Sequence, residues 1–247
     1  MNILAIGAHP DDIEIGCSGT LLRAAREGHE LYFYVVTHGE VGGSPEQRMK
    51  ELFIAATHMH VKKLWLDNFP DARLTTNAEL IYHIEWIISK CNPNIIFTHS
   101  KSDVHHDHRA VAVSTIEAAR RIPNILAYEN PVTRRFNPQV YVDITDVIDD
   151  KLSLIRTFSS QNHRDYTAKE AIKGLAEYRA LQSRNNQFVT HAEAFEVVKL
   201  SFSQDLALLR TPVITTLSKD LNYDISGIED VPIKSKSNRA IAEEELK

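Results

Sequence analysis

Cysteine is scarce in this chain, since Cys17 and Cys91 are the only two among 247 residues. Two cysteines cannot form the disulfide framework that stabilises small secreted domains, so we expect a reducing compartment, the cytoplasm. Long apolar runs are also missing, and no stretch approaches the roughly 18 residues that a membrane span needs. The N-terminal residues MNILAIGAHPDD contain no basic region before a longer apolar stretch, so we predict no secretory signal.

An excess of positive charge is absent as well. The chain has 28 Lys and Arg against 33 Asp and Glu, which gives a formal net charge of −5 with histidine neutral. Binding of nucleic acid needs a concentrated basic surface, so we expect no nucleic-acid partner. Hydrophobic residues make up 43% and charged residues 25%, ordinary values for a soluble globular protein. Histidine, in contrast, is abundant, and several of the 12 histidines crowd into one segment.

Apolar and β-branched segments alternate with segments of helical periodicity. We predict strands at residues 2–7, 30–37, 63–67, 94–98, 125–128, 140–143 and 194–200. We predict helices at 20–26, 109–121, 146–158 and 167–182. Two further helices begin at capping boxes: one begins at 44–47 and runs towards 60, and the other begins at 76–79 and runs to 91. Alternating strands and helices imply parallel βαβ units. The predicted fold class is therefore α/β, a Rossmann-like open, mostly parallel sheet flanked by helices in a single domain.

The periodic pattern fades at about Gln204. We therefore predict a folded domain at residues 1–203 and a C-terminal extension at 204–247 that is partly loosely ordered. Residues 218–247 are polar, with mixed charge and alternating Lys and Ser, which is typical of a loosely held tail. The alternative is an extension that packs on a neighbouring subunit.

Two segments rich in metal-binding residue types follow predicted strands, where ligands of open α/β sheets bind. The first is His9-Pro10-Asp11-Asp12, after the strand at 2–7. Pro10 biases His9 towards an extended conformation, so His9 and Asp12 could face the same point while Asp11 presents its carboxylate from the side. The alternative is that both aspartates only begin a helix, where the helix dipole favours carboxylates.

The second segment spans residues 99–108 and follows the strand at 94–98. His105 and His108 are three residues apart and share a face if a helix begins there. The alternative is a solvated polar loop with helix capping by Asp103. Ionisable side chains at each of the positions 105–108 are hard to explain as surface alone.

The two segments together offer the ligands of a catalytic metal site. His9, Asp12 and His108 supply two imidazoles and one carboxylate, a set that suits Zn²⁺ and leaves one position open for water. A structural zinc site would be closed, commonly by cysteine, and neither cysteine has the needed spacing. Fe²⁺ accepts the same ligands and is not excluded.

The neighbouring side chains provide groups for acid–base chemistry. Asp11 could take the proton from a water activated by the metal. A protonated His105 could stabilise an oxyanion and protonate a leaving amine, with Asp107 holding the ring in its charged form by hydrogen bond or field. This inventory favours hydrolysis of an amide. No G-x-S-x-G motif supports a serine nucleophile.

These residues resemble a known family. Residues 8–12 together with 14–21 resemble the signature of the LmbE-like (PIG-L) zinc-dependent N-acetylsugar deacetylases. The family's D-x-H-x-D-H-R motif is matched by residues 103–109, its T-x-G-E-x-G-G loop by 37–43 and its AEAF strand by 192–195. The similarity spans roughly residues 2–200.

The resemblance implies roles for six of the residues above: metal ligation by His9, Asp12 and His108, general-base catalysis by Asp11, and stabilisation of the tetrahedral intermediate by His105 with Asp107 as its acidic companion. It also points to two substrate-binding residues. Arg48 lies where the family keeps a substrate-contacting arginine, and Asp71 lies where an acceptor for a sugar hydroxyl would be useful. The alternatives are a solvated helix residue for Arg48 and a turn-forming aspartate for Asp71.

The activity implied by the resemblance is hydrolysis of the N-acetyl amide of an amino sugar or its conjugate, which releases acetate and a free amine. The expected partner is a small N-acetylated sugar, and a homo-oligomer is expected because family members often form trimers or hexamers. The chain departs from the family pattern at Ser18, His38, Ala72 and His106, which leaves the particular substrate undetermined.

Two other functions remain as alternatives. The His106-Asp107 pair resembles the pair of a metal-dependent phosphohydrolase, although such HD domains are all-helical and this chain alternates strands and helices. A non-catalytic nucleotide-binding Rossmann module is the second alternative. Its first turn would carry G-x-G-x-x-G, whereas this chain has G-A-H-P-D-D, whose carboxylates would repel a pyrophosphate.

Overall fold

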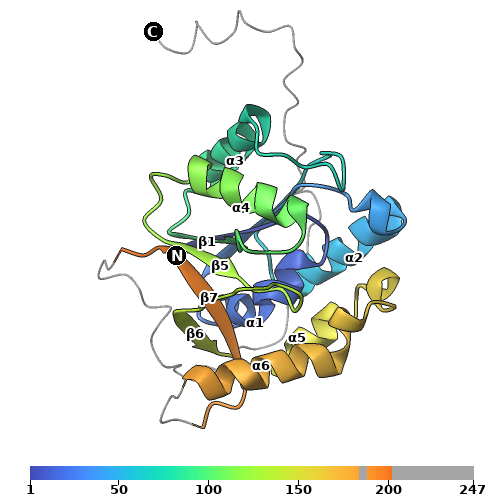
Figure 1. Ribbon diagram of the computed structural model, residues 1–247, viewed down its shortest axis with the longest axis vertical. Coiled ribbons are helices and arrows are strands. Elements are labelled where there is room, and N and C mark those ends of the chain that lie inside the picture. Colours follow the sequence, from blue (N-terminus) through green and yellow to red (C-terminus); the bar gives the residue numbers. More distant parts are fainter. Residues whose placement is uncertain (184–187, 202–247) are drawn as a thin grey trace, which may run out of the picture.

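The computed structural model of the protein describes residues 1–183 and 188–201. Within these residues, seven strands form one sheet in the order β3-β2-β1-β4-β5-β7-β6 (Figure 1). The strands are β1 (Asn2–Gly7), β2 (Glu30–Val35), β3 (Lys63–Leu66), β4 (Ile95–His99), β5 (Ile125–Tyr128), β6 (Val140–Asp143) and β7 (Ala192–Lys199). Strands β1 to β5 pair in parallel, and β7 is antiparallel to both β5 and β6. The predicted fold class, an open and mostly parallel α/β sheet in a single domain, is confirmed.

Helices α1 to α4 connect strands of the parallel part of the sheet, whereas α5 and α6 lie between the antiparallel strands β6 and β7. The α-helices are α1 (Asp12–Arg26), α2 (Pro45–His58), α3 (Ala78–Cys91), α4 (His106–Ala118), α5 (Ile148–Ile155) and α6 (Lys169–Ser183). Three short 3₁₀ turns are η1 (Glu40–Gly42), η2 (Ser159–Gln161) and η3 (Asp165–Thr167). None of these helices is long and apolar enough to cross a membrane. The predicted extension at 204–247 lies outside the described residues.

The sheet is covered by helices on both faces. Along β1, Ile3 and Ala5 point into one hydrophobic core, and Leu4 and Ile6 point into the other. Helices α1 and α2 cover the first face, whereas α3 and α4 cover the second (Figure 1). Because β1 is buried on both faces, its sequence is one continuous apolar run, as is typical of a central parallel strand.

Helix α1 begins at Asp12, so the predicted start at Thr20 is wrong. Every residue from 12 to 21 is buried, and the alternation of apolar and polar residues that marks an amphipathic helix is therefore missing. Gly16 also lowers helix propensity, yet the packing requires it. A Cβ atom there would lie 2.2 Å from the ring of Tyr128.

The other predicted helices are found with shifted ends. The Ser44 hydroxyl caps α2 as expected, but Asn77 rather than Thr76 caps α3. Helix α4 begins at His106 instead of Arg109, because polar residues in a first helical turn carry no apolar periodicity.

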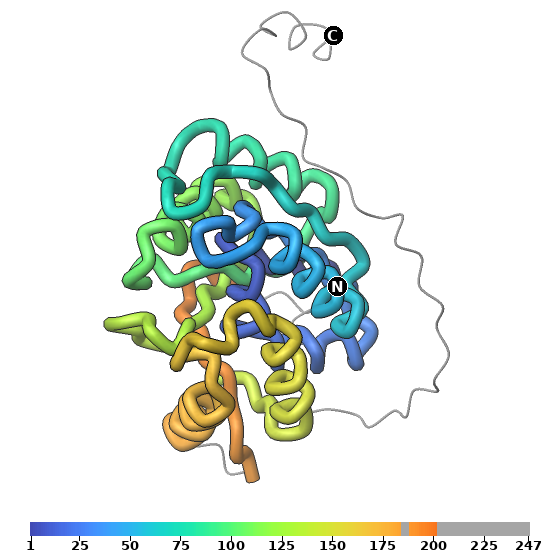
Figure 2. Tube along the Cα trace, turned by 90° about the vertical axis from the view of Figure 1, so that its right-hand side faces the viewer, coloured from blue at the N-terminus to red at the C-terminus, as the bar shows by residue number. Residues whose placement is uncertain are grey.

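Strands β1 and β4 are neighbours in the sheet, so the loops that follow their carboxyl ends lie next to each other. The connection after β1 leads to β2 on one side of this point, and the connection after β4 leads to β5 on the other side. Open α/β sheets bind their ligands at such a switch point. Helices α5 and α6, yellow to orange in Figure 2, gather on one side of the molecule, and α5 packs against α1. The segment between α5 and α6 reaches the region at the carboxyl ends of β1 and β4.

Candidate metal centre and active site

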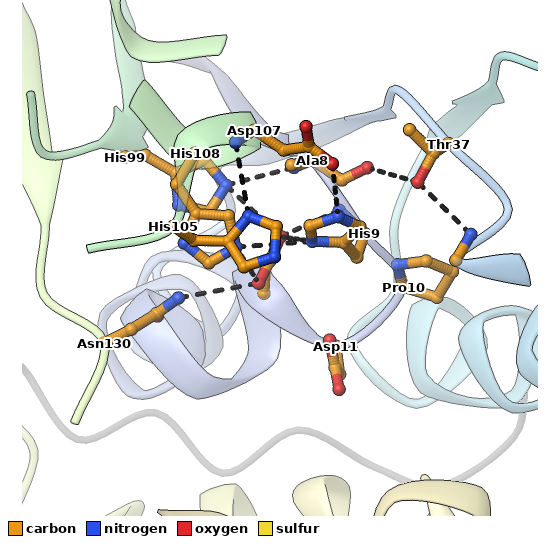
Figure 3. Close-up of polar contacts among 12 residues, drawn as sticks. Ala8, His9, Pro10, Asp11, Thr37, His99, His105, Asp107, His108 and Asn130 are labelled. Carbon is orange, nitrogen blue, oxygen red and sulfur yellow. Dashed lines mark hydrogen bonds and ion pairs between the residues drawn. The ribbon is translucent and has the colours of Figure 1, made fainter. Parts of the chain in front are cut away.

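The chain turns tightly between β1 and α1 (Figure 3). The His9 backbone N–H donates a hydrogen bond to Asp12 Oδ2 at 2.7 Å, so this carboxylate closes the turn. Asp11 is the N-cap residue of α1 and has a φ angle of 112°, in the left-handed region that non-glycine residues rarely adopt. The turn therefore brings His9 and Asp12 together and directs Asp11 away from them.

The second motif forms the start of α4. His105 is the N-cap residue, and its backbone N–H donates to Asp103 Oδ1 at 2.8 Å. The first helical turn then places the rings of His105 and His108 on one face, with centroids 4.7 Å apart. Both rings face the loop that follows β1 (Figure 3).

Donor atoms from three side chains of the two motifs lie at nearly equal distances. His9 Nδ1 is 3.2 Å from Asp12 Oδ2, and His108 Nε2 is 3.2 Å from Asp12 Oδ1. The two ring nitrogens are 3.3 Å apart. Ligands at about 2.0–2.1 Å from a tetrahedral zinc ion are separated by roughly 3.3–3.4 Å. The three side chains therefore have the spacing of one face of a tetrahedral site, and we call them the ligand triangle.

The other nitrogen of each ring in the ligand triangle faces a carboxylate. His9 Nε2 lies 3.1 Å from Asp107 Oδ2 and 3.0 Å from Asp71 Oδ1. His108 Nδ1 lies 3.2 Å from Asp103 Oδ2. Histidines that bind metals commonly donate their second N–H to a carboxylate, which fixes the nitrogen that faces the metal. A carboxylate oxygen lies within 3.2 Å of the second nitrogen of both rings, which fits a bound divalent cation.

The carboxylates of this cluster are balanced by positive charge on the two imidazoles. Burial lowers the pKa of both rings, but the surrounding carboxylates, Asp12 foremost, together outweigh it, so the pKa of His9 is raised well above its usual value and that of His108 to about 9. Burial likewise raises the pKa of Asp12, yet the imidazoles hold it well below its ordinary range. The same carboxylates would attract a divalent cation, so the charge of this cluster fits such an ion.

His99, at the end of β4, lies directly behind His108. The two ring planes are 15° apart and their centroids are separated by 3.9 Å. His99 Nε2 accepts a hydrogen bond from the Ala8 N–H at 3.0 Å and lies 3.1 Å from the Tyr128 hydroxyl. Burial, reinforced by His108, lowers the pKa of His99 to about 4. His99 is therefore a neutral ring that supports His108 from behind.

Asp11 lies beside the ligand triangle, and its carboxylate contacts Arg48 of α2. Arg48 Nη2 donates to Asp11 Oδ1 at 3.2 Å and to the Pro10 carbonyl at 2.6 Å, while Nη1 donates to the Gly39 carbonyl at 3.0 Å. A Cβ atom at Gly39 would lie 2.3 Å from Nη1, so glycine is required there. Burial raises the pKa of Asp11 to about 7, although Arg48 lowers it. Arg48, predicted as a substrate contact, thus also holds Asp11 in place.

The contact between His105 and Asp107 differs from the predicted one, in which Asp107 holds the His105 ring in its charged form. The Asp107 backbone N–H donates to His105 Nδ1 at 3.2 Å, whereas its carboxylate accepts from the N–H groups of Ala72 and Leu74 at 2.8 and 2.9 Å. Burial and the nearby His108 lower the pKa of His105, and the opposing field of Asp107 is smaller. His105 therefore favours the neutral form, with its proton on Nε2 because Nδ1 accepts a hydrogen bond.

A cavity of about 230 Å³ opens beside the ligand triangle. Every site residue predicted from the sequence lines it, except Asp107. Asp71 is held at its edge by the Val41 N–H, which donates to Oδ2 at 2.9 Å. Ligand sites for drug-sized molecules are commonly about 300–1,000 Å³, so this cavity suits a small group such as a single sugar ring.

Several residues around the cavity were missed by the sequence analysis. Asp103 was considered only as a helix cap, although the D-x-H-x-D-H motif contains it. Asn130 follows β5, and its Nδ2 lies 3.5 Å from Asp12 Oδ1, so the rule that sites follow strand ends could have found it. Gln161, Arg164 and Tyr166 also line the cavity, but they come from the segment between α5 and α6, which carries no motif.

Two further histidines have contacts outside the ligand triangle. The ring of His106 is half exposed, and its Nε2 lies 3.0 Å from Asp107 Oδ1, so it is not simply a solvent-facing side chain. His191 does not line the cavity, and its Nδ1 lies 2.8 Å from the Thr190 hydroxyl.

Comparison with protein families matches residues 4–119 to PIG-L, described as GlcNAc-PI de-N-acetylase. This stretch contains the whole ligand triangle. YaiS, an uncharacterized deacetylase of Escherichia coli (strain K12), is 37% identical over 156 residues, which cover 58% of this chain and 82% of that protein. The diacetylchitobiose deacetylase of Thermococcus kodakarensis is 28% identical over 189 residues, which cover 66% of this chain and 71% of that protein.

A solved structure shares the fold at lower sequence identity. The crystal structure of GalB, the 4-carboxy-2-hydroxymuconate hydratase of Pseudomonas putida KT2440, matches with a TM-score of 0.73 and 19% identity. The match covers 83% of this chain and 99% of that one. The fold is thus also that of a hydratase, so the chemistry has to be argued from the site itself.

Proposed function

Because the chain belongs to the PIG-L (LmbE) family of de-N-acetylases, we propose that it hydrolyses the N-acetyl amide of an amino sugar or an amino-sugar conjugate. The products would be acetate and a free amine. The observation that carries this proposal is the ligand triangle, with the Asp11 carboxylate beside it in a cavity of about 230 Å³. Amide hydrolysis needs an electrophile, a base and a hydrogen-bond donor to the oxyanion, and each has a candidate here.

We propose that His9, Asp12 and His108 hold a divalent metal ion, with Zn²⁺ as the first candidate. The spacing of the donor atoms and the carboxylates behind both rings support this assignment. When bound, the ion would polarise the amide carbonyl and lower the pKa of a water molecule. The same side chains accept Fe²⁺, and metal analysis of the purified protein distinguishes the two.

Asp11 is the proposed general base. Arg48 engages Oδ1 of this carboxylate, which leaves Oδ2 to take the proton from the attacking water. Burial raises the pKa of Asp11 to about 7, close to the pH at which a base of this kind is most effective. Asp11 can then return the same proton to the leaving nitrogen, so this one carboxylate both accepts and donates the proton.

His105 is the proposed donor to the developing oxyanion. Its Nδ1 accepts the Asp107 N–H at 3.2 Å, so the proton on Nε2 is available for the substrate oxygen. The neutral ring already provides this hydrogen bond, and no charged imidazole is required. In this proposal Asp107 contributes by orienting two rings, through its backbone to His105 and through its carboxylate to His9.

Arg48 and Asp71 are the proposed contacts to the sugar. Both line the cavity, and a carboxylate such as that of Asp71 can accept hydrogen bonds from sugar hydroxyls. Both cysteines are buried free thiols, which supports the proposal of a reducing, cytoplasmic location. A homo-oligomer remains part of the proposal through the family resemblance.

Acetate release from a panel of N-acetylglucosamine conjugates tests the proposed activity. We expect chelation to abolish release and added Zn²⁺ to restore it. A metal-loaded protein that releases acetate from no conjugate would contradict the proposal. Hydration of 4-carboxy-2-hydroxymuconate, or release of phosphate from nucleotides, in a protein inactive on amides would assign the site to a different reaction.

A further inference from the structure

One wall of the cavity comes from the segment between α5 and α6, drawn in yellow in Figure 1. Gln161, Arg164 and Tyr166 of this segment line the cavity. The segment is fastened to α2, because the buried Glu51 carboxylate accepts hydrogen bonds from the Ser160 N–H at 2.9 Å and from its hydroxyl at 2.5 Å. The wall therefore has a defined position relative to Arg48, which lies on the same helix.

Arg164 is oriented by its neighbours within this wall. Its Nε donates to Gln161 Oε1 at 2.9 Å, and Gln161 Nε2 in turn donates to the Gly42 carbonyl at 3.2 Å. Its guanidinium carbon lies 6.0 Å from the centre of the Tyr166 ring, within the range of a cation–π contact. A Cβ atom at Gly42 would lie 3.4 Å from Arg164 Nη2, so glycine leaves room for the guanidinium at this point.

The charges that line the cavity are paired, with one exception. Asp11 is paired with Arg48, and the histidines of the ligand triangle are paired with Asp12 and Asp71. Arg164 makes no ion pair with any residue that the structure describes, and its Nη atoms have no hydrogen-bond acceptor there. Arg164 is partly exposed and its guanidinium is free to bind an anion in the cavity, and its planar fork suits a carboxylate or a phosphate.

Arg164 is close enough to the proposed reaction centre to act on the same substrate. Arg48 contacts Asp11 at 3.2 Å and lies 2.7 Å from the position of a Cβ atom on Gly42, the same position that is 3.4 Å from Arg164. Asp11, Arg48 and Arg164 thus line the same cavity, and the two arginines both lie beside Gly42.

We propose that Arg164 binds a carboxylate or phosphate on the conjugate and thereby selects acidic N-acetylamino-sugar conjugates over neutral ones. This inference rests on the proposed deacetylase function and names the class of substrate. Arg164 acts as a specificity-determining residue, because it contacts the substituent and not the amide.

The test compares three substrates of the zinc-loaded, full-length protein: the methyl glycoside of N-acetylglucosamine, its glycolic acid glycoside and N-acetylglucosamine 1-phosphate. We expect the wild type to prefer at least one acidic substrate. In Arg164→Gln, kcat/KM for that substrate should fall about 10- to 100-fold more than for the methyl glycoside, the range for losing a hydrogen-bonded charge. Arg164→Lys should recover part of the preference. The acidic substrate that responds identifies the group as carboxylate or phosphate.

A second arginine serves as the matched control. Arg156 is exposed and lies outside the cavity, so Arg156→Gln removes the same charge without changing the preference. Equal losses on all three substrates in Arg164→Gln, or a wild type without any acidic preference, would overturn the inference while leaving deacetylation intact. Failure of the proposed function looks different, since no substrate, including the methyl glycoside, would then release acetate.

Discussion

The two walls of the cavity are built in different ways. The wall at the ends of β1 and β4 is largely buried, and both ring nitrogens of His9 and of His108 lie 3.0–3.2 Å from a carboxylate oxygen. The outer wall, residues 159–167, presents the partly exposed Arg164 and Tyr166 and is held through Gln161 and Glu51. Chemistry that needs fixed geometry is suited to the first wall, whereas recognition of a substituent is suited to the second.

This contrast leads to a ranking of mutational effects. Changes at the strand-end wall should alter metal binding or the rate of the chemical step. Changes at the outer wall should alter KM and the choice of substrate. A variant of one wall that produces the effect expected for the other wall would show that the two walls are not independent.

The largest effect is expected for His108→Ala, which removes one of the three proposed ligands. We expect metal content to fall far below one ion per chain, and activity to fall by more than the roughly 10⁴-fold that loss of a general base can cost. Metal analysis and acetate release measure the two effects. His106→Ala, two residues earlier with a half-exposed ring, is the control that should keep its metal. Equal metal loss in both variants would show that the ligand assignment is wrong.

Asp11→Asn should have the next largest effect, and on rate alone. The substitution keeps the size of the side chain but removes the proposed base, so kcat should fall about 10²- to 10⁴-fold. Metal content should stay as in the wild type, because Asp11 lies outside the ligand triangle. Asp12→Asn, at the adjacent position, should instead lose metal. Full activity in Asp11→Asn would exclude it as the base.

Asp103→Asn tests the carboxylate behind His108. Removing the charge 3.2 Å from His108 Nδ1 should lower metal affinity about 10- to 100-fold, the usual cost of losing a group that orients a ligand. Competition with a chromogenic chelator measures the affinity. Asp165→Asn, an exposed aspartate of the outer wall, is the matched control. An unchanged affinity in Asp103→Asn would mean that His108 is oriented by its packing on His99 instead.

Gln161→Ala should have the smallest effect and should be confined to the outer wall. It removes the hydrogen bonds to Arg164 and to the Gly42 carbonyl, so KM should rise about 3- to 10-fold. Metal affinity should not change. Steady-state kinetics and a thermal melt distinguish lost recognition from lost stability, with the exposed Asn162→Ala as the control. A fall in metal affinity as large as that of Asp103→Asn would refute the separation of the two walls.

The sequence predicts most of the strand-end wall because its residues lie in two short segments. Rules about strand ends and helical spacing place His9, Asp12, His105 and His108 from local information alone. The sheet is predicted for a similar reason, since the central strands β1, β2 and β4 are rich in apolar residues. Helix α1 was misplaced because burial on all sides removes the periodicity on which the prediction depends.

The remaining features depend on contacts between segments that are distant in sequence. The hydrogen bond between Arg48 and Asp11 joins α2 to the loop before α1, and the sequence around neither residue predicts it. The outer wall has no motif, because its position is set by Glu51 on α2 and by the Gly42 carbonyl. Such roles follow from packing, which a single sequence does not specify locally.

The attachment of the outer wall through Glu51 has a practical consequence for protein engineering. Glu51 holds the start of the segment at Ser159 and Ser160, and residues 162–166 lie beyond this anchor. We expect that loops of other length or charge at 162–166 would leave the Glu51 anchor and the proposed catalytic groups in place. The scaffold therefore offers a route to redesigned enzymes that keep the same reaction and differ only in their substrate specificity.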